Sequence, residues 1–215
     1  DSTLRMAAYI KDGKLVPGSS VSSAIISGTV GDLSASNIVI DSRDDDFAGI
    51  VVDGNSNYTV NGATITLNGH GQDDFAGTSA GLSVRGDATL TINNANIDTT
   101  GSIRTGIWAG ENAKLIVKNS KIVGHDGDDL DFKYSMMNEV PWVLGLKGNL
   151  RSTGLLGGAQ ATYLNSWVEA ENWGALSTDS NSKGATLTAI NTDVVISGES
   201  GYGSYADQQV QNFYY

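Results

Sequence analysis

The chain contains no cysteine and only two prolines among its 215 residues. The absence of cysteine excludes disulfide bonds, zinc–thiolate sites and a cysteine nucleophile. Charged residues make up only 17% of the chain, whereas 27 residues are glycine. This composition argues against a helical bundle and favours many short strands joined by tight turns. Hydrophobic residues reach 40%, which is enough to fill a core.

Positive charge is also scarce, with 13 Lys and Arg against 24 Asp and Glu, which gives a net charge of −11. Because phosphate binding requires clustered Lys and Arg, we expect no nucleic-acid partner. No apolar run approaches the roughly 18 residues of a membrane helix, so we expect no membrane span. The chain begins at Asp1 and not at Met. We therefore expect a removed leader and a secreted, periplasmic or cell-surface protein.

Two nearly equivalent units follow one another at residues 81–97 and 106–122, and an earlier one lies at 49–65. Each has a glycine, a short apolar alternation, a turn, a second alternation and a polar loop. The aligned positions are the glycines Gly49, Gly81 and Gly106, the starts of the second alternation near Val60, Leu90 and Leu115, and the final anchors Ile65, Ile97 and Ile122. A repeat of about 20 to 35 residues made of short strands is typical of a solenoid.

We therefore predict an all-β fold, a right-handed parallel β-helix solenoid with an N-terminal cap and one long loop insertion. The expected parts are a cap (1–23), regular coils (24–122), the insertion (123–153) and further coils (154–215). Antiparallel hairpins are the alternative, since an Asn-Gly turn favours them, but the whole order of elements recurs and not one turn alone.

Two further features concern the ends of strands and the end of the chain. Asparagine recurs near predicted strand ends, at Asn61, Asn68, Asn93, Asn119, Asn165 and Asn191. Either these side chains stack and bond to one another, or asparagine is there because it tolerates turns. The aromatic ending at 212–215 would leave an open sheet edge, so we expect missing chain or a second chain to cover it.

The segments 90–97 and 115–122, each preceded by a Gly–apolar–x–apolar strand, resemble the pectin-lyase-like superfamily of right-handed parallel β-helices over about residues 24–200. The resemblance is architectural and includes no family-specific catalytic motif. That superfamily contains polysaccharide lyases, glycoside hydrolases, epimerases, adhesins and autotransporter passengers. The resemblance therefore implies the fold and does not choose the function.

Stacked repeats would bring loops of equal rank together, about 4.8 Å apart per strand. The loops that precede the glycine strand are 41–49, 70–77, 98–105 and 125–134, and they contain both histidines and many aspartates. The pentapeptide Asp-Asp-Phe-Ala-Gly is identical at 45–49 and 73–77. Crowded carboxylates require a cation, a basic partner or raised pKa values.

Three interpretations of this acidic edge stay open: a Ca²⁺ site built from carboxylates, acid–base catalysis, or solvated turn residues. The spacing matches neither the Ca²⁺-binding nonapeptide repeat nor an EF-hand loop, so we assign no metal ligand and no cofactor. No nucleophile elbow, phosphate loop or dinucleotide fingerprint occurs either.

We expect an exported enzyme, a lyase, hydrolase or isomerase, that transfers protons on a carbohydrate in a groove of stacked acidic loops. The predicted catalytic residues are His125, Asp129, Asp131, Lys133 and Tyr134. The predicted substrate-binding residues are Arg104, Arg151, Trp142, Met136, Asp74 and His70. The alternatives are a surface adhesin without catalysis, and an isomerase or lyase of a small apolar substrate.

Overall fold

The computed structural model describes residues 5–17, 24–128, 140–179 and 184–215. The protein is nearly all β, with parallel sheets, as the composition predicts. The described part has one helix, α1 (Val140–Val143). No helix in the described ranges has the length and the apolar character needed to cross a membrane.

One sheet, called sheet A, has eight strands, and every pairing in it is parallel except β1 with β2. In chain order its strands are β1 (Arg5–Lys11), β2 (Lys14–Leu15), β5 (Phe47–Asp53), β7 (Ala80–Val84), β9 (Thr105–Ala109), β12 (Arg151–Leu155), β15 (Trp173–Thr178) and β18 (Gly201–Ala206).

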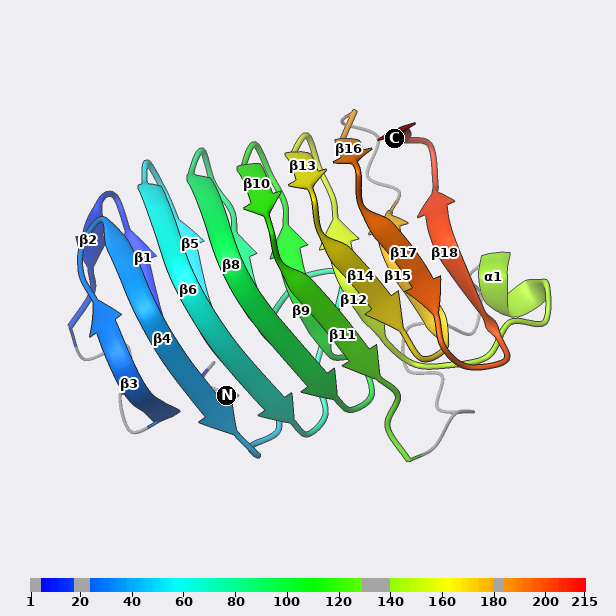
Figure 1. The fold of residues 1–215 in the computed structure, drawn as a ribbon, viewed down its shortest axis with the longest axis horizontal. Coiled ribbons are helices and arrows are strands. Elements are labelled where there is room, and N and C mark those ends of the chain that lie inside the picture. The colour runs from blue at the N-terminus through cyan, green and yellow to red at the C-terminus, as the bar shows by residue number, and fades with distance from the viewer. Residues whose placement is uncertain (1–4, 18–23, 129–139, 180–183) are drawn as a thin grey trace.

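The second sheet, called sheet B, has eleven strands, and only β3 and β4 pair antiparallel in it. Its strands are β3 (Ile25–Val30), β4 (Ser34–Ser42), β6 (Asn57–Asn68), β8 (Thr89–Thr100), β10 (Lys114–Lys118), β11 (Lys121–His125), β13 (Gln160–Leu164), β14 (Trp167–Ala170), β16 (Thr186–Ile190), β17 (Asp193–Ile196) and β19 (Val210–Tyr214). Figure 1 shows the strands of sheet B side by side across the front, in chain order from β3 to β17.

The strand register confirms most of the predicted alignment. Ile65 pairs with Ile97, and Ile97 pairs with Ile122. The strand residues that follow the repeated glycines pair as well, Ile50 with Leu82 and Leu82 with Ile107. One position is shifted: Leu90 pairs with Tyr58 and not with Val60, because the buried alternation of β6 already begins at Tyr58.

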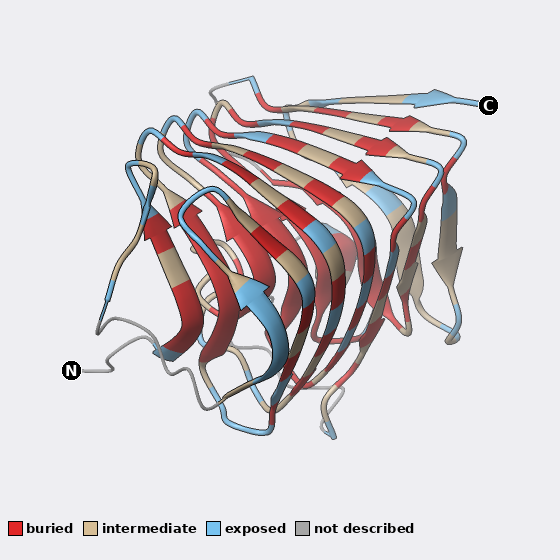
Figure 2. Cartoon of the chain, turned by 60° about the vertical axis from the view of Figure 1, so that its left-hand side comes forward, coloured by how far each residue is buried: buried red, intermediate tan, exposed pale blue. Residues whose placement is uncertain are grey.

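The core lies between the two sheets, and the inner strands of sheet A, from β5 to β15, are buried on both faces. Strands of sheet B alternate between buried and less buried residues, whereas β7, β9 and β12 are buried at every position. Figure 2 shows this difference as banded ribbons in sheet B and continuous red ribbons in the inner strands of sheet A. Parallel strands buried on both faces must be covered on the outside too, so the outer face of sheet A is an enclosed surface.

Sheet B changes direction along a line that we call the corner row: Asn37, Gly62, Asn94, Asn119, Asn165 and Asn191, all with positive φ. Asparagine and glycine adopt this left-handed conformation at low cost. The side chains also stack, since Asn93 Nδ2 donates to Asn61 Oδ1 at 3.0 Å and Asn191 Nδ2 to Asn165 Oδ1 at 2.7 Å. The left-handed backbone thus accounts for Asn119, Asn165 and Asn191, and side-chain bonding for the pairs Asn61–Asn93 and Asn165–Asn191.

Three predicted boundaries differ in the structure. β1 runs parallel to β5 as a regular strand of sheet A, so the predicted cap at 1–23 is in part a sheet strand. β3 is an antiparallel edge strand and not a regular coil strand, and four of its six residues are exposed. The long connection runs from the end of β11 to the start of β12, so it is shorter than 123–153 at both ends.

The last strands end on exposed apolar residues. Val210, Phe213, Tyr214 and Tyr215 are between 42% and 90% exposed. In the described part of the chain, β19 pairs only with β16, and β18 only with β15. That a second chain or further chain covers this end stays a prediction.

Candidate functional site

The outer face of sheet A holds a buried ion cluster, which we call the Arg151 cluster: Asp74, Arg151 and Asp179. Arg151 begins β12, Asp74 lies in the loop before β7, and Asp179 follows β15 directly. Arg151 Nη1 donates to Asp74 Oδ2, and Arg151 Nε lies 3.4 Å from Asp179 Oδ2. The three side chains are 3%, 0% and 6% exposed for Arg151, Asp74 and Asp179. One guanidinium thus joins two carboxylates away from water.

Aromatic rings hold the guanidinium from two sides. The guanidinium carbon of Arg151 lies 4.7 Å from the ring centroid of Phe75 and 6.0 Å from that of Trp173. Trp173 also meets Tyr202 edge to face at 6.0 Å, and the Tyr202 hydroxyl lies 2.5 Å from Ser177 Oγ. Cation–π contacts of this kind strengthen when they are removed from water, so the cluster has a fixed orientation.

The electrostatics of the cluster favour a bound proton. Burial raises the pKa of Asp179; Arg151 opposes this rise, while Asp74 and Asp207 add to it. Two carboxylates against one guanidinium would leave a net negative charge in a poorly solvated place, which is costly. The protonated form of Asp179 is therefore favoured more than that of an aspartate in water.

Beside the cluster lies an apolar wall of Ala80, Trp108, Leu156 and Phe75. The indole of Trp108 fits among glycines, because a Cβ atom on Gly110 or Gly154 would lie 2.1 Å or 2.9 Å from it. The sequence places these glycines where no larger residue would leave room for the ring. The wall and the charges together form a surface with an apolar part and a proton-exchanging part.

Among the described residues, β7 and β9 contain three buried polar atoms with no hydrogen-bond partner, Ser83 Oγ, Thr105 Oγ1 and Trp108 Nε1, and Trp173 Nε1 on the same face has none either. Ser83 pairs in register with Trp108, and Thr105 pairs with Arg151. Leaving such an atom unpaired costs about 1–3 kcal/mol. Buried polar atoms of this kind usually have a partner, in the protein or in ordered water.

Arg104, a predicted substrate-binding residue, has a different surrounding. It is fully buried, and its guanidinium donates to the carbonyl oxygens of Gly69 (3.1 Å), Ser79 (3.2 Å), Asp44 (2.9 Å) and Phe47. Burial lowers the pKa of Arg104 to about 10, against the effect of Asp45 and Asp46. Arg104 therefore ties the loops before β5 and β7 to β9, and its contacts give no support to a role in substrate binding.

The two histidines lie apart from the Arg151 cluster. His70 is exposed, and its Nδ1 accepts a hydrogen bond from the backbone of Ser102 at 3.2 Å. The side chain of His125 is 38% exposed; its Nε2 lies 3.3 Å from Asp98 Oδ2 and its Nδ1 3.6 Å from Glu171 Oε2. Both are thus surface groups with local partners.

The remaining predicted residues fall into two groups. Asp129, Asp131, Lys133, Tyr134 and Met136 lie outside the described residues. Trp142 belongs to α1 and packs with Ile103 and Trp173, which places it next to the Arg151 cluster. Among the predicted substrate-binding residues, the structure therefore brings together Asp74, Arg151 and Trp142.

The repeated pentapeptide does not occupy equivalent places. Phe47 is an inward core residue of β5, whereas Phe75 lies on the outer face of sheet A. The reason is the register, which aligns Ile50 with Leu82, so the second copy lies in the loop before β7.

The acidic residues of this edge have separate partners. Arg5 pairs with Asp44 at 2.9 Å, and Asp73 Oδ1 accepts from the backbone of Phe75 and Ala76. Asp126 accepts from the backbone of Asn149 at 2.8 Å and from the Asn172 amide at 2.9 Å. Among the described residues no group of three His, Cys, Asp or Glu could hold a metal ion. The Ca²⁺ interpretation has no support in this part of the chain.

Sequence reasoning missed Asp179, Trp173 and the buried Asp126. Burial raises the pKa of Asp126, although its bonds to Asn149 and Asn172 oppose the rise. The sequence signal for Asp179 is its place directly after the apolar run 174–176; in the structure it follows β15, whose last residue Thr178 pairs with Leu155 at the end of β12.

The chain was compared with protein-family models, with curated proteins and with solved structures, and none of them matches. Its function must therefore be argued from the geometry of the outer face of sheet A.

Proposed function

We propose that this chain is an enzyme that transfers protons on a small, partly apolar substrate held against the outer face of sheet A. One observation supports this above the others: two buried carboxylates share one guanidinium beside three unpartnered polar atoms of the described strands β7 and β9. A carboxyl group with a raised pKa in an enclosed place, as Asp179 is, is typical of acid–base sites.

In the proposed reaction, Asp179 is the acid–base residue. Its carboxylate takes a proton from a carbon next to a carbonyl group, and the electron pair moves to the carbonyl oxygen. The N–H of Trp108 donates a hydrogen bond to that oxygen, which satisfies its own unpaired donor. Asp179 then returns the proton to another carbon, which is an isomerisation, or to a leaving group, which is an elimination.

The other two charged residues are positioning residues. Arg151 compensates the charge of Asp179 whenever that carboxyl is ionised, and Asp74 fixes the guanidinium of Arg151. Without Arg151 the ionised state of Asp179 would be too costly to form in a buried place.

The same surroundings favour a small substrate over a polysaccharide on this face. Phe75, Trp108 and Leu156 offer carbon surface, and the charged groups beside them are buried. A polymer needs an open groove, so among the alternatives from the sequence the isomerase or lyase of a small apolar substrate has the most support here.

For the fold, we propose the right-handed parallel β-helix, similar to the pectin-lyase-like superfamily. In support, each repeat contributes strands to both sheets, and each of these pairs in parallel with the strand of the next repeat. Export to the periplasm, the cell surface or the medium remains part of the proposal, on the acidic, cysteine-free composition.

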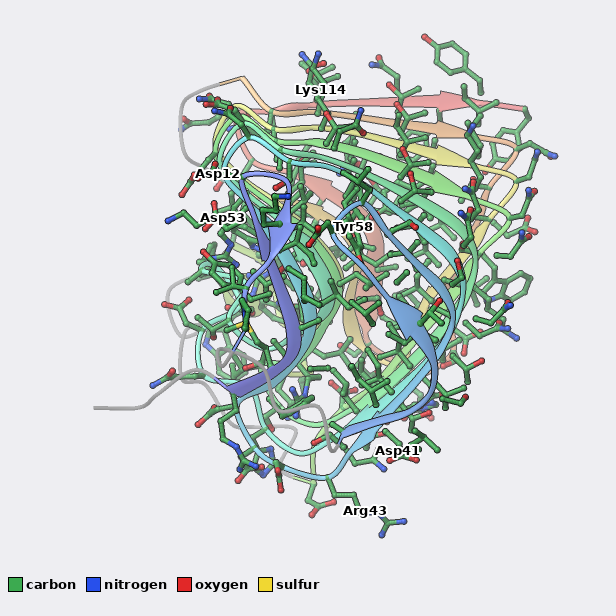
Figure 3. All side chains as sticks on the ribbon, turned by 90° about the vertical axis from the view of Figure 1, so that its left-hand side faces the viewer. Asp12, Asp41, Arg43, Asp53, Tyr58 and Lys114 are labelled. Atoms are coloured by element: carbon green, nitrogen blue, oxygen red, sulfur yellow. The ribbon has the colours of Figure 1, made fainter. Side chains whose placement is uncertain are left out.

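The experiment that tests the proposed reaction uses small phenyl-substituted ketones such as phenylacetone in D₂O, with ¹H NMR to follow the loss of the α-protons. We expect faster exchange with the wild-type protein and a return to the uncatalysed rate with Asp179→Asn. The matched control is Asp41→Asn, since Asp41 is exposed and lies at an edge of sheet B, where Figure 3 shows it near the exposed Arg43. The proposal fails if no ketone binds and exchange never exceeds that of Asp179→Asn.

A further inference from the structure

The outer face of sheet B contains two adjoining hollows, away from the site on sheet A. One has a volume of about 460 Å³ and lies between the corner residues Asn119, Asn165 and Asn191 and the strand residues Lys121, Trp167 and Asp193. The other has a volume of about 230 Å³. Asn96 and Lys121 line both hollows, so the two form one furrow.

The furrow runs across the strands and not along them. Lys121 pairs in register with Trp167, and Trp167 pairs with Asp193, so one wall repeats at the strand spacing of about 4.8 Å. The opposite wall is the corner row, which repeats with the same step. A ligand that fits such a furrow is linear and repeats a similar unit along its length.

The floor of the furrow is rigid. Ser120 and Ser166 are buried, and each backbone N–H of this pair donates to the hydroxyl in the next strand, at 3.2 Å for Ser120 to Ser166 and 3.3 Å for Ser166 to Thr192. The Ser120 and Ser166 hydroxyls in turn donate to backbone carbonyls within their own corners. The walls therefore stand on a preformed surface, which lowers the entropic cost of binding.

The walls combine amides with one fixed indole. Asn165 and Asn191 bond to each other at 2.7 Å and still have donors and acceptors left for a ligand. Trp167 is partly exposed; its Nε1 donates to Glu169 at 3.1 Å, and the Lys121 ammonium lies 5.6 Å from its ring centroid. Amides that pair with hydroxyl groups, next to a ring that packs against C–H groups, suit a sugar chain.

Other polymers fit this furrow less well. A nucleic acid would need several cations, whereas the described residues of the walls include one lysine beside an aspartate, in a protein of net charge −11. An extended peptide would bind by adding along a strand edge, but β11 and β14 are paired on both sides, and the open edge of β17 runs along that strand and not along the furrow.

We infer that the furrow binds a linear, uncharged oligosaccharide that lies across β11, β14 and β17, with Trp167 packing against one sugar ring and the corner asparagines pairing with hydroxyl groups. This site is independent of the proposed reaction on sheet A, because the two lie on different sheets.

The test is isothermal titration with three linear hexasaccharides, cellohexaose, mannohexaose and maltohexaose, and with the disaccharide of whichever binds. We expect at least one hexasaccharide to bind, and its disaccharide to bind at least tenfold more weakly, because it spans fewer strands. Trp167→Ala and Asn165→Gly should each weaken binding about tenfold or more, and Trp167→Phe should retain part of the affinity. Circular dichroism on each variant shows whether it is folded.

Two control variants show whether any loss of binding is specific to the furrow. Lys114→Ala changes an exposed residue of β10 in the same sheet and should leave binding unchanged. Asp179→Asn should also leave it unchanged, so a failure of the proposed enzyme site and a failure of the furrow are distinguishable. The inference is wrong if none of the three hexasaccharides binds, if folded Trp167→Ala and Trp167→Phe bind as wild type does, or if the disaccharide binds as tightly as the hexasaccharide.

Discussion

Asp74 and Arg151 form a buried ion pair although they are 77 positions apart in the chain. The pair joins the loop before β7 to the start of β12, across the intervening strand β9. Because the charge of Arg151 is shared between Asp74 and Asp179, the guanidinium is not available as a simple anion receptor. In the proposed reaction the acid–base role therefore falls to a carboxyl group and not to Arg151.

The first prediction concerns the stability of Asp179→Asn as a function of pH. Burial raises the pKa of Asp179, so the ionised form is less favourable in the folded than in the unfolded protein. The contribution of protonated Asp179 to the stability of the folded protein is thus fully present below the ordinary aspartate pKa of about 3.9. It is lost as the pH rises through the folded-state pKa. The side chain of the variant cannot ionise. As the pH rises, the free energy of unfolding of the variant minus that of wild type should therefore increase, by at most about 1.4 kcal/mol per pH unit.

Urea unfolding at several pH values between 4 and 8 measures this difference. Asp41→Asn serves as the control, and its difference from wild type should stay flat, since Asp41 is exposed. A difference for Asp179→Asn that shrinks as the pH rises would mean that the pKa of Asp179 is lowered and not raised.

The second prediction concerns Arg104. Arg104→Met should lower the free energy of unfolding by about 3–5 kcal/mol, because it removes hydrogen bonds from a charged donor and leaves buried carbonyls unpaired. Arg104→Lys should retain only part of the stability that Arg104→Met loses, since one ammonium cannot reach the carbonyls of Gly69, Asp44 and Ser79 together. The exposed Arg43, changed to Met, should cost less than about 0.5 kcal/mol. Equal losses at 104 and 43 in denaturant unfolding would refute the assigned role.

The third prediction isolates the backbone conformation of the corner row. Asn119 has φ of 51°, so Asn119→Ala should be less stable than Asn119→Gly by about 1 kcal/mol, because a Cβ disfavours the left-handed region. At Asn57, which is exposed and lies outside the positive-φ positions, the order of Ala and Gly should reverse. Thermal unfolding of the four variants measures these differences in stability. The same order of Ala and Gly at positions 119 and 57 would contradict the prediction.

The fourth prediction tests the fit of Trp108. Gly154→Ala would place its Cβ 2.9 Å from Trp108 Cδ1, so the indole must move, at a cost of about 1–3 kcal/mol. The near-ultraviolet circular dichroism of the protein should change accordingly. Gly31→Ala is the control, since its nearest neighbour would lie at 3.6 Å. An unchanged spectrum for Gly154→Ala would show that the ring is held more loosely than its contacts indicate.

The sequence predicted the stacking order of the strands better than it predicted their side-chain partners. Ile65, Ile97 and Ile122 could be aligned in advance because an inward position must be apolar in every repeat, and they do pair. By contrast, the sequence predicts that the second alternation of the first repeat starts at Val60, two residues later than in the structure. There it starts at Tyr58, which is as buried as the aliphatic residues that follow it.

Partners on the outer face of sheet A depend on loop length, which repeat counting does not supply. The two copies of Asp-Asp-Phe-Ala-Gly look equivalent, yet the longer second loop moves Phe75 to the outer face while Phe47 stays in the core. For the same reason Asp179 was overlooked and Arg104 was given a role that its backbone contacts do not support.

The uniform register of β6, β8, β10, β13 and β16 bears on how such a chain can evolve. Successive strands pair without any shift along their length, as Leu90 with Leu115 and Leu115 with Ala161. A duplicated repeat inserted between two strands would meet the same surfaces that it replaces, and it would lengthen the molecule by about 4.8 Å. The number of copies thus sets the length of the furrow on sheet B, and repeats added outside the segment from Asp74 to Asp179 would extend it while the Arg151 cluster keeps its geometry.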